Sequence, residues 1–150
     1  PQVQKERLLS LVKCDDSSLV EVYGMEDWSA PMASGSNASK AMVIVPATTG
    51  SLSAVATGQS NNLIERAADV MMKERKPLIL VLRETPFNAI HLKNMLTLTE
   101  AGAIVMPANP GFYHMPKTVE DIIDFMVARI LDQLNIEHNL MDKWGDSQPS

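Results

Sequence analysis

The chain has a single cysteine, Cys14, among its 150 residues, so no disulfide can form within it. Aromatic residues make up 5%, and no apolar run approaches the roughly 20 residues that a membrane-spanning helix needs. Acidic residues outnumber basic ones, 18 to 13, which argues against a general nucleic-acid-binding surface. We therefore expect no nucleic-acid or membrane partner, and the low cysteine count with ten methionines predicts a reducing, cytoplasmic setting.

Several motifs with a defined chemistry are also missing. The sequence contains no GxGxxG, no GxxxxGK[ST] and no GxSxG pattern. Its three histidines do not stand at metal-ligand spacing with Cys14, so we expect no metal site. Cys14 follows Lys13 on a polar segment and is expected to be incidental rather than a nucleophile.

Short apolar runs are present instead, at residues 41–46, 77–82 and 103–107. Continuous runs of this length, rich in branched residues, are typical of strands buried on both faces of a parallel sheet. Residues 18–24 also have the composition of a strand. Helical spacing of apolar residues recurs in residues 1–12, 62–75, 88–101 and 118–134.

Strands that alternate with helices predict a doubly wound α/β domain with a parallel sheet. Thr118, with Asp121 three residues later, predicts a capping box at the start of the last helix. The whole chain, residues 1–150, is expected to be one domain. Its tail, residues 140–150, is polar around Trp144 and is expected to be disordered.

Ligands of such sheets bind beyond the carboxyl ends of the strands, so the residues after each run are the candidates. The first run is followed by Thr48, Thr49, Gly50 and Ser51, and the second by Arg83 and Glu84. The third is followed by a proline-stiffened loop that carries Phe112, Tyr113 and His114. Each has a purely structural alternative: a capped helix start, an ion pair at the rim, and aromatic rings that pack on the core.

The predicted helix at residues 62–75 places Arg66 and Lys73 on one face, where they would suit an anion. A favourable Asp69–Lys73 pair at i,i+4 is the structural alternative. Arg129 lies within the apolar last helix, where a cation needs a partner or a route to solvent.

Longer motifs add a family resemblance. Residues 61–86, "NNLIERAADVMMKERKPLILVLRETP", and residues 110–131, "PGFYHMPKTVEDIIDFMVARIL", resemble the flavin prenyltransferases of the UbiX type. Residues 27–36, "DWSAPMASGS", and residues 50–58, "GSLSAVATG", fit the same pattern. The resemblance covers nearly the whole chain.

The resemblance implies a three-layer, flavodoxin-like or Rossmann-like flavin-binding domain that assembles into dodecamers built from trimers. Members join a dimethylallyl group from dimethylallyl phosphate to N5 and C6 of reduced FMN, without a metal ion. The prenylated FMN serves UbiD-type decarboxylases. The flavin lies between subunits, so one pocket can draw residues from different chains.

Site residues follow from the resemblance by matching position. It implies that the FMN contacts are Thr48, Thr49, Gly50, Ser51 and Arg83. It implies that Lys73, Glu84, Tyr113 and Arg129 surround the dimethylallyl phosphate, that Arg66 is near the same site, and that Trp28 and Trp144 are near its entrance. Catalytic roles fall on Glu84, Lys73 and Tyr113.

The family pattern begins with a strand and a glycine/serine-rich loop that cradles the FMN phosphate, followed by a helix and a second strand. None of these stands in this chain, which starts at Pro1, so we expect it to be the C-terminal two-thirds of a family domain. Two alternative functions stay open. One is a flavin-dependent cysteine decarboxylase, whose "PASANT"-like motif would replace "PATTGSLSA", and the other is a non-catalytic flavin-binding module.

Overall fold

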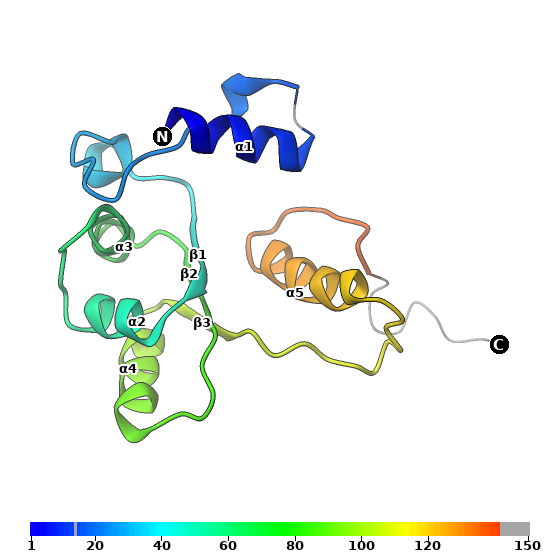
Figure 1. Ribbon diagram of the computed structural model, residues 1–150. Helices are drawn as coiled ribbons and strands as arrows, with labels where there is room; N and C mark the ends of the chain where they lie inside the picture. The colour runs from blue at the N-terminus through cyan, green and yellow to red at the C-terminus, as the bar shows by residue number, and fades with distance from the viewer. Residues whose placement is uncertain (14, 142–150) are drawn as a thin grey trace.

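A three-stranded parallel sheet is the centre of the structure (Figure 1), a computed structural model that describes residues 1–13 and 15–141. The strands β1 (Met42–Ala47), β2 (Leu78–Leu82) and β3 (Ile104–Pro107) lie in the order β1-β2-β3. All three apolar runs are thus confirmed as strands, and the predicted α/β fold with a parallel sheet is confirmed. The tail around Trp144 lies outside the described residues.

Burial differs between the centre and the edges of the sheet. Every residue of β2 is buried, as its continuous apolar sequence predicts for a central strand. β1 exposes Val45 and Pro46, and its pairing with β2 shifts between Ile44 and Ala47. Proline has no N–H for a ladder and is therefore tolerated on an edge strand.

Three helices pack on one side of the sheet through a shared apolar core. α2 (Thr49–Ala56), α3 (Leu63–Lys73) and α4 (Ala89–Glu100) lie together on one side of the sheet, and α5 (Val119–Gln133) lies on the other side (Figure 1). The core joins alternate residues of β2 to residues of the three helices: Leu78, Leu80, Leu82, Leu52, Met71 and Leu98. Within the described residues no helix is long and apolar enough to cross a membrane.

Side-chain caps explain where four helices begin. Thr48, Asn62, Asn88 and Thr118 each accept a hydrogen bond from the backbone N–H three residues later. The capping box between Thr118 and Asp121 is confirmed. Such caps satisfy backbone donors that a helix start leaves free.

The predicted strand at residues 18–24 is wrong. Ser17–Leu19 form a short 3-10 turn, and residues 20–24 pair with no strand among the described residues. A strand needs a neighbour for its backbone hydrogen bonds, and propensity alone does not supply one. The opening helix is confirmed as α1 (Gln2–Val12), but none of its residues is buried.

Replacing Leu80 tests how far the fold depends on the central strand. Leu80 is fully buried, so Leu80→Ala removes apolar contacts and leaves a cavity. We expect the free energy of unfolding, measured by urea denaturation, to fall by about 2–5 kcal/mol. Leu80→Met is the matched control, because it conserves volume and is expected to cost less than about 1.5 kcal/mol. Equal losses for the two variants would contradict a tightly packed core.

Candidate functional site

The three strands end side by side, so the loops that follow them start at one edge of the sheet. Leu82 pairs with Ala47 on one side and with Pro107 on the other. Beyond the strands, Arg83 N donates to Ala47 O over 3.3 Å, and Ala108 N donates to Leu82 O over 2.7 Å. The predicted grouping of candidates at the carboxyl edge is therefore present for the loops after β1 and β2.

The loop after β1 turns at once into α2. Thr48 Oγ1 accepts from Ser51 N over 3.1 Å and lies 3.1 Å from Ser51 Oγ, so the alternative of a capped helix start is correct. The cap does not exclude a ligand, because the helix start still directs its N–H groups towards the sheet edge. A side chain at Gly50 would meet only Thr48 Oγ1, at 3.6 Å, so the approach to this turn is open.

Arg83 and Glu84 follow β2 at the same edge. Arg83 is exposed and Glu84 half-buried, and no ion pair joins them in the part of the chain that the structure describes. Glu84 Oε1 instead accepts from Thr85 N over 3.1 Å. The alternative of a structural ion pair at the rim is therefore wrong, and Arg83 is an exposed residue at the edge of the sheet where α2 begins.

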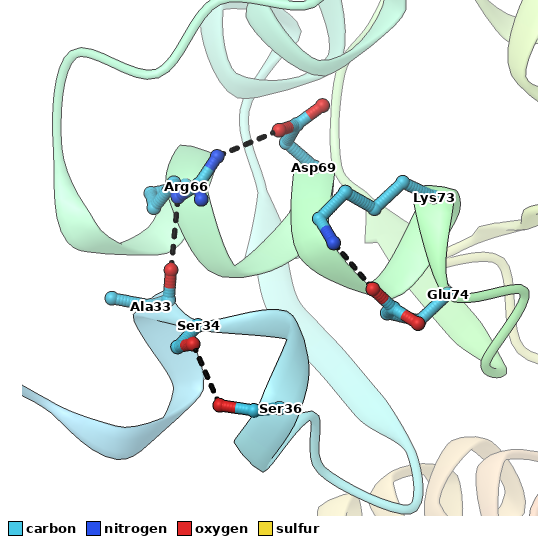
Figure 2. A network of polar contacts seen from close by, with 7 residues as sticks. All are labelled: Ala33, Ser34, Ser36, Arg66, Asp69, Lys73 and Glu74. Atoms are coloured by element: carbon cyan, nitrogen blue, oxygen red, sulfur yellow. Dashed lines mark hydrogen bonds and ion pairs between the residues drawn. The ribbon is translucent and has the colours of Figure 1, made fainter.

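A second group of polar side chains lies on α3, where it meets the loop before β1 (Figure 2). Arg66 Nε donates to Ala33 O over 2.9 Å, and Arg66 Nη1 donates to Asp69 Oδ2 over 3.1 Å. Lys73 Nζ pairs with Glu74 Oε1. The shared face of Arg66 and Lys73 is confirmed, whereas the predicted Asp69–Lys73 pair is wrong because each side chain has another partner.

Three small residues of that loop were missed as candidates by the sequence reasoning. Ser34 Oγ and Ser36 Oγ lie 3.0 Å apart, next to the α3 side chains (Figure 2). A Cβ built on Gly35, between them, would lie 2.4 Å from Lys73 Nζ. The signal in the sequence is the tripeptide Ser-Gly-Ser, but only the fold shows which helix it meets.

A third group belongs to α5 and the loop before it. The Tyr113 ring contacts His114 and Phe125 edge-on, with centroids 5.9 Å apart in both cases, and the His114 ring stacks on Phe125 at 5.3 Å. Tyr113 itself is 60% exposed. The alternative that the aromatic rings pack on the core holds for His114, whereas Phe112 and Tyr113 are mostly exposed.

Arg129 finds the partner that its place in an apolar helix requires. Its Nη1 donates to Asp132 Oδ2 over 2.7 Å, and Asp132 Oδ1 lies 2.9 Å from His138 Nε2. Leu140 N donates to His138 Nδ1 over 3.3 Å, so Nε2 carries the proton and donates to Asp132. Arg129 also lines a groove of about 320 Å³ between β3 and α5.

One chain does not bring all these candidates together. Lys73 precedes β2 and lies at the amino edge of the sheet, whereas Glu84 follows β2 at the carboxyl edge. The five residues of β2, at about 3.3 Å each, separate the two edges by roughly 16 Å. Trp28 is 50% exposed in the loop before β1, and Trp144 lies outside the described residues.

The donor set of these groups can be compared with what a flavin and a phosphate need. The carboxyl edge offers hydroxyls, a helix start and a guanidinium, which suit the anionic and carbonyl oxygens of FMN. The α3 group offers an ammonium and a guanidinium, which suit a phosphate. In the described residues no three His, Cys, Asp or Glu side chains are placed to hold a metal ion.

Acid titration tests the Arg129–Asp132–His138 network. The hydrogen bond from His138 is the largest effect that lowers the pKa of Asp132, and the charge of Arg129 adds to it. Because this pKa is lowered on folding, the stabilisation is complete above the unfolded pKa of Asp and is lost as the pH falls through the folded pKa. We expect wild type to have a higher melting temperature than Asp132→Asn at neutral pH, and the gap to close in acid.

The control for that titration is Asp124→Asn, which removes a carboxylate from the same helix but none of these bonds. Its difference from wild type should stay small at every pH. A gap between wild type and Asp132→Asn that persists into acid would show that the carboxylate charge is not the cause.

Known proteins resemble the chain over most of its length. The family model described as Flavoprotein matches residues 5–131. Flavin prenyltransferase UbiX of Pseudomonas aeruginosa is 61% identical over 127 residues, which cover 85% of this chain and 61% of that protein. Flavin prenyltransferase UbiX of Halalkalibacterium halodurans is 46% identical over 98% of this chain and 76% of its own length. The chain thus spans less than two thirds of the first relative.

Solved structures agree with this assignment. AnUbiX, in complex with FMN and dimethylallyl pyrophosphate, has a TM-score of 0.83 and 37% identity over 93% of this chain and 78% of its own. A dodecameric FMN-dependent Ubix-like decarboxylase from Escherichia coli O157:H7 has a TM-score of 0.81 and 39% identity over 85% of this chain and 70% of its own. The chain belongs to the UbiX-type flavin prenyltransferase family of flavoproteins.

Proposed function

We propose that this chain is the part of a flavin prenyltransferase that joins a dimethylallyl group from dimethylallyl phosphate to N5 and C6 of reduced FMN. The observation that carries the proposal is the carboxyl edge of the sheet. There Arg83 and Glu84 stand beside the open start of α2, and no ion pair in the described part of the chain joins the two. The solved relative in complex with FMN and dimethylallyl pyrophosphate supports it.

FMN is a substrate of this reaction, and reduced flavin supplies the electron-rich atoms that are alkylated. The residues that would hold it are Thr48, Thr49, Gly50, Ser51 and Arg83. Hydroxyls, the N–H groups of the first turn of α2 and the Arg83 guanidinium supply hydrogen bonds to its oxygens. Gly50 leaves room for a flat ring to approach the backbone.

Departure of an allylic phosphate builds negative charge on the leaving group. The cations Lys73 and Arg129 and the hydroxyl of Tyr113 would stabilise that charge, which lowers the barrier to bond cleavage. Arg66 is already bonded to Ala33 O and Asp69, so its direct part is to fix the loop that faces Lys73. Trp28 and Trp144 would border the entrance.

Glu84 is the candidate for proton transfer. Alkylation of the ring carbon C6 must be followed by loss of its proton, and a carboxylate within reach can accept it. Glu84 is half-buried, and one of its oxygens is held by Thr85 N, which orients the other. Next to Arg83, it would lie on the flavin side of the pocket.

The separation of Lys73 from Glu84 gives the assembly a role in the site. Since the two lie at opposite edges of one sheet, the pocket would form where the carboxyl edge of one copy meets the α3 group of another. A homo-oligomer, of dodecameric size as in the Escherichia coli relative, provides such junctions. The product would pass to a UbiD-type decarboxylase in the cytoplasm.

Anaerobic turnover tests the proposed reaction. The protein is mixed with FMN, dithionite and dimethylallyl monophosphate, and the mass of the released flavin is measured. We expect a gain of one C5 unit, and a rate in Glu84→Gln slower by about 10²-fold or more, because the proton acceptor is lost. Glu100→Gln, an exposed carboxylate at the end of α4, is the control. Unmodified FMN would favour a non-catalytic flavin-binding module.

Mixing two inactive variants tests the shared pocket. Lys73→Ala and Glu84→Gln are each expected to be impaired, because each lacks one side of the pocket. Co-expressed subunits should recover part of the activity, since some junctions then combine an intact Lys73 from one copy with an intact Glu84 from another. Mixtures that stay as inactive as the separate variants would show that both residues act from the same chain.

A further inference from the structure

Glu74 is the partner of Lys73 (Figure 2). The charged ends of both side chains lie close to Gly35. A Cβ on Gly35 would lie 2.3 Å from Glu74 Oε1 and 2.4 Å from Lys73 Nζ, both distances that real side chains do not show. Gly35 does not have a positive φ, so the backbone does not require glycine there. The charged ends of both side chains approach the loop backbone closely, and a methyl group there would move these flexible ends aside.

Polar groups surround this point on several sides. The hydroxyls of Ser34 and Ser36 lie on the loop, and the Lys73 side chain is 47% exposed. Arg66 donates through Nε to Ala33 O and through Nη1 to Asp69. Lys73, by contrast, donates to the side chain of the next residue, Glu74. The hydrogen bond and charge of Lys73 hold the pKa of Glu74 below its ordinary value, so Glu74 is charged at neutral pH.

We propose that Glu74 is an internal anion that occupies the Lys73 subsite and is displaced by a phosphate-bearing ligand. The inference rests on the proposed function, in which Lys73 contacts the phosphate. A carboxylate paired with the ammonium stands where an oxygen of the phosphate would bind. An incoming anion must therefore bind Lys73 more strongly than the Glu74 carboxylate does.

This competition with Glu74 discriminates between classes of anion. A phosphate monoester carries about −1.5 to −2 charges at neutral pH and three terminal oxygens, so it can replace one carboxylate and also reach the nearby hydroxyls. A monocarboxylate carries one charge, as Glu74 does, and gains nothing by the exchange. Glu74 is thus a specificity-determining residue that favours phosphate over carboxylate ligands.

Binding of inorganic phosphate and of acetate, measured by calorimetry on the full chain, tests this role without any turnover. We expect Glu74→Gln to bind phosphate about two- to five-fold more tightly, the range set by an exposed ion pair. Acetate, undetectable with wild type, should bind measurably to the variant. Glu100→Gln removes the same charge elsewhere and should change neither affinity. Weaker or unchanged phosphate binding by Glu74→Gln, or no binding by any form, would overturn the proposal.

The variant Gly35→Ala provides a second test of the proposal. The added methyl group moves the ends of the Lys73 and Glu74 side chains away from the loop, so we expect phosphate affinity to fall by about two- to five-fold, the worth of an exposed ionic contact. Far-UV circular dichroism reports whether the fold is retained. A variant that binds as wild type would overturn the role of Gly35. If Glu74→Gln tightens phosphate binding but no form alkylates FMN, the subsite stands and the proposed reaction fails.

Discussion

Parallel pairing of β1, β2 and β3 decides which parts of the chain can meet. Parallel strands need a crossover connection between them, here one that contains helices. All strands therefore end at one edge of the sheet, and each crossover leads back to the opposite edge, where the next strand begins. The register that aligns Ala47, Leu82 and Pro107 places the loops after the strands in one row. Every residue of β2 is buried, so close packing of side chains on both faces of the strand holds that register.

This topology divides the candidate site within one chain. Arg83 and Glu84 belong to the carboxyl edge, whereas Lys73 ends the helix that leads back to the amino edge. Tyr113 and Arg129 belong to a third part, α5 and its loop, on the other side of the sheet from α2–α4 (Figure 1). Residues that one reaction is expected to need are therefore held apart by a rigid element. Under the proposed function, self-association would unite them, and assembly would be a requirement for the chemistry.

Sequence patterns predicted the parts of the structure that depend on local chemistry. The three strands, the capping box at Thr118 and the residues at the carboxyl edge follow from apolar runs, cap residues and the rule for parallel sheets. The strand at residues 18–24 was wrong because pairing needs a neighbour that propensity cannot supply. Asp69 pairs with Arg66 at i,i+3 instead of with Lys73 at i,i+4, and spacing along a helix allows both pairs. The closeness of Gly35 to Lys73 depends on how a distant loop packs on α3, which that spacing does not reveal.

A crystal structure of the assembled protein with FMN and dimethylallyl monophosphate tests the central claim most directly. The account predicts a flavin against Arg83 and Glu84 of one copy, with the phosphate within hydrogen-bond distance of Lys73 Nζ of another copy and with Glu74 turned away from Lys73. A pocket in which Lys73 and Glu84 come from the same chain, or a phosphate bound away from Lys73, would contradict it.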